Sequence, residues 1–461
     1  MAIFLLVILV VSLLIIATES VNHINKAAIA MFGGVCCWLL YIVQGTIFIS
    51  NEHPIEFLTY ISSNEISANS VKSFISEHIF VKYIAQCANI VLFLLATTCI
   101  VEVLSSNGCF DFIAEWMRTR NPKKLLWTLA SITFIISANL DNLATVVLLL
   151  SIIHPLLQDR KVRRVYCSVI ILAANLGGVI AVISDMTCLK LWSDGLIQPT
   201  AYFSTLILPA LTALSIILYL FYRNLPRRIE FATTTLPYRG DDTILNRSQR
   251  LLMLFVGIGG LWFIPTFHRI TLLPPFVGAL CVLALLWIVN ELCNRQLLRS
   301  DKMTQRRLPL ALQYANIQNI LYYIGLILMF GALTESGILK DIYNYLITHI
   351  DNIYIISLIT TFISSILGNV PTLLGSSALF NQPSLVNTPE CMQAGGVFWS
   401  LLSYTTAWGG SLLSTGTIAG ILLMRMEGVS FKWYFKNVTP KVLIGFSFGF
   451  ILLAITTYNF A

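Results

Sequence analysis

A carboxylate and an amide interrupt a long apolar stretch in "SANLDNLATVVLLL" (residues 137–150). Asp141 and Asn142 have mostly apolar residues on both sides. Burying an ionisable group within a membrane costs ~3 kcal/mol or more, so such a group is a candidate for function. The structural alternative is a helix cap, in which Asp141 accepts backbone N–H bonds at the start of the next helix. The two roles are compatible.

A second polar group lies in "NLGGVIAVISDMT" (residues 175–187), which supplies Asn175, Asp185 and Thr187. The paired glycines 177 and 178 weaken a helix and predict unwinding inside a long apolar segment. In the alternative interpretation, Gly178 is a point of close helix packing and Asp185 is an ion-pair partner of Lys190.

A third group combines "GNVPTLLGSS" (368–377) with "WGGSLLSTGT" (408–417). Asn369, Ser411, Ser414, Thr415 and Thr417 offer amide and hydroxyl oxygens but no carboxylate. Small residues at a helix contact are the alternative explanation. Glu102 and Glu335 stand at the ends of apolar segments, where each is either a solvated terminal carboxylate or part of a proton relay or access path.

These residue types indicate a hard-oxygen site for a small cation. Asp141 and Asp185 would be the charged ligands for Na⁺ or Li⁺, with further oxygens from Asn142, Asn175 and Thr187. A cation and protons would compete for the same carboxylate oxygens, which is sufficient for antiport if only the loaded or the protonated carrier crosses the membrane. No transition-metal cluster and no cofactor are expected, and the ten cysteines are interpreted as small hydrophobic residues.

The composition places these residues in an integral membrane protein. Of the 461 residues 57% are hydrophobic and 11% are charged, whereas soluble domains carry about 25% charged residues. The net charge of +7 therefore indicates basic cytoplasmic loops and not a nucleic-acid partner. The predicted spans are 2–18, 27–49, 83–104, 165–191, 200–222, 251–267, 271–292, 312–334, 396–424 and 440–459.

Charge predicts the topology. The basic stretches 118–124, 159–164, 223–250 and 294–307 are expected in the cytoplasm, and the acidic stretch 51–80 is expected to be a loop outside. Residues 125–158 lie between two basic stretches but are too few for two crossings, which need about 40 residues. We therefore expect a re-entrant hairpin with its tip, "NLDN", near the bilayer midplane. Ten spans and two hairpins result, with both termini outside.

An internal repeat supplies the second hairpin. Glu102 pairs with Glu335, Asn142 with Asn369, and the Gly-Gly step at 177 with that at 409, always in the same order. The second hairpin has acidic flanks and the first has basic ones, so the two repeats face opposite ways, as in secondary transporters. The predicted organisation is an N-terminal scaffold (1–82), a first repeat (83–222) with hairpin 125–158 and broken helix 165–191, a linking region (223–311), and a second repeat (312–461) with hairpin 353–390 and broken helix 396–424.

The sequence resembles the NhaD-type sodium/proton antiporters of the ion-transporter superfamily along nearly its whole length. Stretches that carry the resemblance include "VEVLSSNGCFDFIAEWMRTRNPKKLLWTLASITFIISANLDNLATVVLLL", "AANLGGVIAVISDMTCLKLW" and "FWSLLSYTTAWGGSLLSTGTIAGILLMRMEGVSFKWYFK". The resemblance implies a multi-pass protein of the plasma (bacterial inner) membrane, a homodimer with a mobile domain, and Na⁺ or Li⁺ exchange for H⁺. By position it assigns polar roles to Asp141, Asn142, Thr145, Asn175, Asp185, Thr187 and Asn369, with Glu102, Ser411 and Ser414 as further matches.

Two departures from the family pattern bear on function. The second hairpin of the family typically reads Asp-Asn-Val-Pro, whereas this chain has Gly368 in the acidic position. Around Asp185 the family usually reads Pro-Ile-Gly-Asp-Val-Thr-Thr, and here the chain reads "VISDMTC". The alternatives are a carboxylate or oxyanion transporter on the same scaffold and a non-transporting relic or sensor.

Overall fold

The computed structural model describes residues 2–22, 24–61, 67–117, 119, 121–223, 225–226, 245–294, 315–350, 352–382 and 389–458. These residues form helices and contain no β-strand, which confirms the predicted all-α polytopic fold. Most of the basic stretches 223–250 and 294–307 lie outside the described ranges. The N-terminal helices are α1 (Ala2–Ala17), α2 (Glu19–Asn22), α3 (Lys26–Val43), α4 (Gly45–Glu52), α5 (Pro54–Ile61), α6 (Ala68–Phe74), the π-helical η1 (Ile75–Phe80), α7 (Val81–Ser106) and α8 (Asp111–Trp116).

The remaining helices follow in three groups along the chain. The first group is α9 (Pro122–Ser137), α10 (Asn142–Leu156), α11 (Arg160–Val179), α12 (Met186–Ser193) and α13 (Pro199–Tyr222). The second is α14 (Arg247–Leu254), η2 (Phe255–Gly259), α15 (Gly260–Thr271) and α16 (Pro275–Cys293). The third is α17 (Ala315–Glu335), α18 (Ile338–His349), α19 (Ile353–Leu367), α20 (Asn369–Phe380), η6 (Glu390–Met392), α21 (Val397–Leu412), α22 (Ile418–Glu427), α23 (Phe431–Asn437) and α24 (Thr439–Thr457).

The described helices match the ten predicted spans. Eight helical stretches are long and apolar enough to cross a membrane. The other two predicted spans correspond to α1 and α21, which have 16 residues each. The protein is therefore a multi-pass membrane protein.

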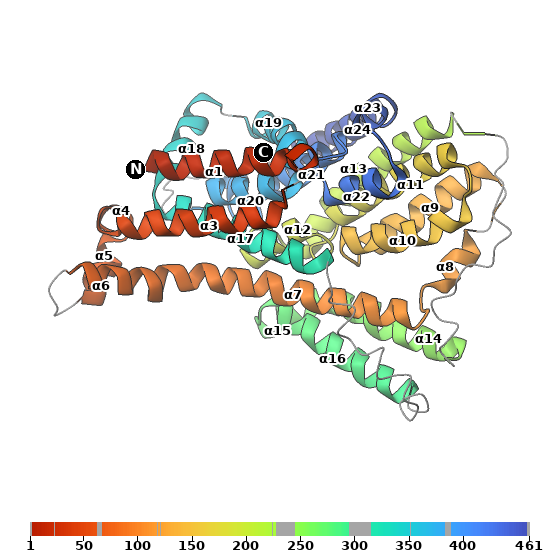
Figure 1. Ribbon diagram of the computed structural model, residues 1–461, viewed down its shortest axis with the longest axis horizontal. Helices are drawn as coiled ribbons and strands as arrows, with labels where there is room; N and C mark the ends of the chain where they lie inside the picture. The colour runs from red at the N-terminus through yellow and green to blue at the C-terminus, as the bar shows by residue number, and fades with distance from the viewer. Residues whose placement is uncertain are drawn as a thin grey trace.

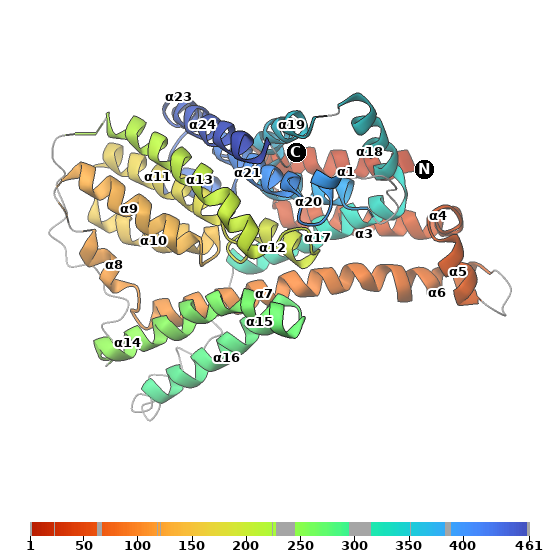
Figure 2. The same ribbon diagram turned by 180° about the vertical axis from the view of Figure 1, so that it is seen from behind.

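Two helical hairpins lie where the sequence predicts them. α9 and α10 join at residues 138–141, and α19 and α20 join at Gly368. Their helices have 12 to 16 residues, which corresponds to about 18–24 Å at 1.5 Å per residue. Figures 1 and 2 show that the two hairpins approach the middle of the molecule from opposite ends.

Two long helices are interrupted beside the hairpin tips. α11 ends at Val179 and α12 begins at Met186, and α21 ends at Leu412 and α22 begins at Ile418. The paired glycines 177 and 178, which were expected to unwind, remain helical, and the interruption starts after them. They serve close packing, because a Cβ at Gly177 would lie 2.4 Å from the Phe134 carbonyl oxygen.

Matched contacts relate the two repeats. The Ser137 hydroxyl donates to the Ala174 carbonyl over 2.7 Å, and the Ser364 hydroxyl donates to the Thr406 carbonyl over 2.6 Å. A Cβ at Gly177 would meet the backbone oxygen of Phe134, and one at Gly409 would meet that of Thr361. Each hairpin therefore packs on its interrupted helix in the same way.

The acidic stretch 51–80 differs from the loop that its charge suggested. Residues 68–106 form one continuous helical stretch of 39 residues, about 58 Å long at 1.5 Å per residue, and Figure 1 shows it running along most of the molecule. Val71, Phe74, Ile75 and Ile79 are buried because their helical spacing turns one face toward the core formed with α4 and α5.

The buried apolar residues form two cores. One core contains α1, α3 to α6, the first part of α7, and α17, together with Val370 and Leu374 of α20. We call α1, α3 to α6, the first part of α7 and α17 the α3–α17 unit; this name does not include the helices that lie between them in the chain. The other contains both hairpins and both interrupted helices, which we call the hairpin unit, and also α13, α24 and α14 to α16.

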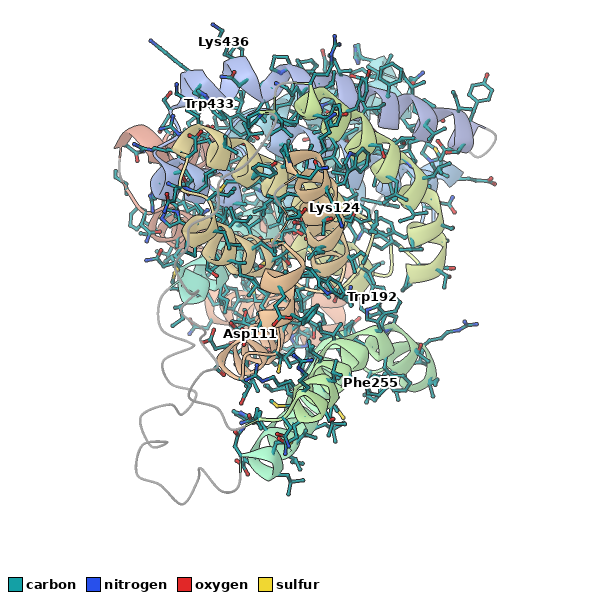
Figure 3. All side chains as sticks on the ribbon, turned by 90° about the vertical axis from the view of Figure 1, so that its right-hand side faces the viewer. Asp111, Lys124, Trp192, Phe255, Trp433 and Lys436 are labelled. Atoms are coloured by element: carbon teal, nitrogen blue, oxygen red, sulfur yellow. The ribbon has the colours of Figure 1, made fainter. Side chains whose placement is uncertain are left out.

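Helices α14 to α16 pack along α7 at one edge of the second core. Figure 3 shows them at the lower right, with the labelled Phe255 on them. Phe255 is 77% exposed. In a membrane protein such an apolar surface faces lipid or another subunit.

Candidate functional site

The tip of the first hairpin is organised by Asp141. Its side chain is the N-cap of α10, and Oδ2 accepts hydrogen bonds from the backbone N–H groups of Leu143 (3.1 Å) and Ala144 (3.3 Å). The capping role considered for this residue is therefore present. Both capping hydrogen bonds are accepted by Oδ2. Oδ1 makes no capping bond and is available to a ligand in the cavity that Asp141 lines.

Asn142 connects the hairpin tip to the interrupted helix. Its Oδ1 lies 2.7 Å from the Ser137 hydroxyl oxygen, whose single proton is shared between Asn142 and the Ala174 carbonyl. Its Nδ2 donates to Oδ2 of Asp185 over 3.3 Å. Gly178 makes this approach possible, because a Cβ there would lie 1.9 Å from Oδ1 of Asn142. The Gly-Gly step thus lets the two polar segments meet.

Asp185 lies at the end of the interruption between α11 and α12, where it is the N-cap of α12. Its Oδ1 accepts from the backbone N–H of Thr187 over 3.3 Å, and the residue is 7% exposed. Lys190 binds Asp194 instead of Asp185, so the ion-pair alternative for Asp185 does not hold.

A cavity of about 50 Å³ collects these groups between the two packing units. At 10–15 Å³ for each water-sized sphere, this is room for roughly three to five of them. Among the predicted residues it is lined by Asp141, Asn142, Asn175, Asp185 and Asn369. The first residues of α10, α12, α20 and α22 all contribute to the lining, so four helix N-termini, which carry partial positive charge, border one small space.

Four other predicted site residues, Thr145, Thr187, Ser411 and Ser414, are buried but do not line the cavity. Ser411 accepts a hydrogen bond from the amide of Asn175 over 2.9 Å and is 1% exposed. Thr187 contacts Asp185 through its backbone N–H. Thr145 and Ser414 are fully buried, and the hydroxyl oxygen of each has no hydrogen-bond partner in the part of the chain that the structure describes.

The second repeat presents a different pair of caps. Position 141 corresponds to Gly368, and position 185 to Thr417, whose hydroxyl accepts from the Gly420 N–H over 3.1 Å. Gly368 has φ +97° and ψ 162°, a conformation that residues with a side chain rarely adopt, and a Cβ there would lie 3.0 Å from the Gly416 carbonyl oxygen. The missing acid is therefore accompanied by a backbone shaped for glycine.

Thr417, a member of the third predicted polar group, also lines the cavity, just before the start of α22. Three further polar residues line it without having been predicted as site residues: Thr98 of α7, and Asn319 and Tyr323 of α17. Asn319 is the fifth residue of α17 and follows Asn316 and Gln318 in "ANIQN", so it does not interrupt an apolar run as Asp141 does. Its place in the cavity becomes evident only from the packing of α17.

The two repeat-related glutamates differ in environment. Glu335 is 5% exposed, and its carboxylate accepts from Tyr83 Oη over 2.6 Å and binds Nε2 of His53 over 2.6 Å. Glu102 is partly buried near the end of α7 and makes no hydrogen bond or ion pair with the described residues. Neither glutamate lines the cavity, and their relay role remains a prediction.

His53 supplies a pH-dependent contact outside the spans. The hydrogen bond with Glu335 raises the pKa of His53 above its ordinary value of 6.5; partial burial opposes this, and Glu56 raises the pKa further. A raised folded-state pKa adds stability that is complete below about pH 6.5 and is lost as the pH rises through the folded-state pKa.

We therefore expect His53→Gln to lower the melting temperature of the purified protein more at about pH 6 than at about pH 9. His349→Gln, which removes an exposed histidine of α18 hydrogen-bonded only to the Tyr345 carbonyl, is the control. An equal decrease for His53→Gln at both pH values would contradict the expectation.

The fold and the cavity together define the class. Two hairpins that meet two interrupted helices around a polar cavity are characteristic of secondary transporters. Residues 4–381 match the family described as Citrate transporter (CitMHS), and the chain belongs to this family of membrane transporters.

Two individual proteins and one solved structure are similar to this chain. Sodium/proton antiporter 2 of Arabidopsis thaliana is 32% identical over 379 residues, which cover 82% of this chain and 87% of the relative. The Na⁺/H⁺ antiporter NhaD of Vibrio cholerae is 26% identical over 410 residues, which cover 82% of this chain and 79% of the relative. The crystal structure of the YdaH transporter of Alcanivorax borkumensis superposes with a TM-score of 0.58 at 11% identity, over 93% of this chain and 98% of that chain. The resemblance to NhaD-type antiporters and to the ion-transporter fold is thereby confirmed.

Proposed function

We propose that the protein exchanges Na⁺ or Li⁺ for H⁺ across the membrane. The observation that supports this most is the cavity that Asp141 and Asp185 share. Asn142, the neighbour of Asp141 in the chain, donates its amide to Asp185. Its volume of about 50 Å³ suits a small cation with a few waters. Carboxylate and amide oxygens are the ligands that hard cations prefer.

The proposed cycle uses competition for those carboxylates. When the cation is bound, its charge offsets Asp141 and Asp185; when it leaves, protons take over that role. Only these two neutralised forms cross, because moving uncompensated carboxylates through a low-dielectric region is costly. We propose alternating access in which the hairpin unit moves relative to the α3–α17 unit, in a homodimer of the plasma (bacterial inner) membrane with both termini outside.

One observation favours a second candidate, the transport of a carboxylate or oxyanion. The N-termini of α20 and α22 face the cavity without an acid, and helix N-termini attract anions. Against this, neither Lys nor Arg is among the lining residues, and the two carboxylates in the same space would repel an anion. A citrate ion also has more atoms than the roughly three to five water-sized spheres that the cavity holds.

A transport assay in everted vesicles separates the candidates. We expect Na⁺ or Li⁺, added to respiring vesicles that contain the protein, to collapse part of the ΔpH reported by a fluorescent dye, with choline as the control cation. Uptake of radiolabelled citrate and succinate in the same vesicles should stay at the level of empty vesicles. Anion uptake without any alkali-cation response would reverse the choice.

A further inference from the structure

We infer that Asn319 of α17 is a cation ligand, supplied to the carboxylate site from the opposite packing unit. This inference rests on the proposed exchange function and adds a specificity-determining residue to its site. The ligand chemistry is that of a neutral amide oxygen, Oδ1, toward an alkali cation.

The first observation is the position of the side chain. Asn319 lines the same cavity as Asp141 and Asp185, but it comes from α17, whose buried residues belong to the α3–α17 unit. The carboxylates come from the hairpin unit. The cavity is thus lined by polar groups from both sides of the boundary between the two cores.

The second observation is that the Asn319 side chain has no partner in the part of the protein that the structure describes and lines the cavity. The residue is 6% exposed, and its amide makes no hydrogen bond to any residue that the structure describes, but its polar atoms are not among the fully enclosed unpaired ones. The amide therefore keeps its access to the cavity, where a ligand can bind its oxygen.

The neighbouring residues of α17 argue against simple packing. Gln318 is exposed, and Ile320 is an apolar lining residue. A leucine at position 319 would suit an apolar helix interface better than an amide, because it leaves no polar group unsatisfied. The amide is therefore best explained by what occupies the cavity.

A ligand on the second unit has a consequence for the transport cycle. If the hairpin unit moves relative to α17, it carries Asp141 and Asp185 with it and leaves Asn319 behind. The cation then has one oxygen ligand fewer on the other side of the membrane. We infer that Asn319 makes cation affinity higher in the conformation described here than in the opposite one.

Three variants test the inference in the vesicle assay at alkaline pH. Asn319→Leu removes the oxygen and should raise the KM for Na⁺ about tenfold, the loss expected for one neutral ligand to a charge. Asn319→Asp keeps an oxygen in place and adds charge, so its KM for Na⁺ should stay at or below that of the wild type. Gln318→Leu removes an exposed amide one residue away and should leave KM unchanged.

The outcomes separate this inference from the proposed function. A wild-type protein without any response to Na⁺ or Li⁺ would remove the exchange function itself. A responding wild type with the same KM in Asn319→Leu, or with KM raised equally by Asn319→Leu and Asn319→Asp, would overturn only the role of Asn319. If Asn319→Leu does not yield folded protein, Asn319→Asp is the test. A KM for Na⁺ at or below that of the wild type supports the role of Asn319, and a raised KM overturns it.

Discussion

Asp141→Asn and Asp185→Asn are each expected to abolish cation-dependent proton exchange, with a loss of roughly a hundredfold or more, equivalent to about 2.7 kcal/mol. Asparagine has nearly the same shape and keeps an oxygen that can cap the helix. The caps of α10 and α12 should therefore survive, and the melting temperature should change little. What disappears is the negative charge that cation and proton share.

The same vesicles should carry Asp341→Asn as a matched control, because Asp341 is exposed on α18 and does not line the cavity. Sodium-dependent thermal stabilisation of the purified protein gives a second measurement, since a bound ligand stabilises the folded state. Wild-type exchange rates in either cavity variant would show that the two carboxylates do not form the exchange site.

Gly178→Ala is expected to reduce exchange at least about tenfold while the protein still folds. The new Cβ would lie 1.9 Å from Oδ1 and 2.6 Å from Cγ of Asn142, so the amide must move. It would then lose its hydrogen bonds with Ser137 and Asp185. Because the clash is with a side chain and not with the backbone, the damage should fall on the site more than on the fold.

Alanine substitutions at two other glycines serve as comparisons for Gly178→Ala. Gly259→Ala adds the same methyl group where the nearest atom would be 3.7 Å away, so exchange and stability should both match the wild type. Gly177→Ala would place Cβ 2.4 Å from the Phe134 carbonyl oxygen, a backbone clash that should lower the melting temperature. Equal activity of Gly178→Ala and Gly259→Ala would contradict the packing role assigned to Gly178.

The hairpins and the two buried acids, Asp141 and Asp185, could be predicted from the sequence because ionisable residues stand out in apolar segments, although the capping role of Asp185 was not predicted. Asp141 interrupts an apolar run, and basic stretches on both sides restrict its segment to a re-entrant path. The repeat then extended this argument to the second hairpin. In the structure the helices of the first hairpin span residues 122–156, and those of the second span residues 353–380, which is ten residues short of the predicted end at 390.

Features that depend on packing between distant segments could not be predicted in this way. Charge suggested a loop at 51–80, although the spacing of Val71, Phe74 and Ile79 on one helical face was present in the sequence. The Gly-Gly step had two interpretations, and only its contact with the first hairpin selects close packing. The part played by Asn319 requires knowing that α17 closes the cavity.

The backbone at Gly368 limits how this transporter could regain a second pair of acids. An aspartate at 368 would have to adopt a φ near +97° beside the Gly416 carbonyl, so restoring the family residue alone strains the tip that it should equip. Thr417 has φ −135° and ψ 155°, close to the −123° and 140° of Asp185, and tolerates an acid without such strain. The backbone therefore accommodates an acid at position 417 more readily than at position 368.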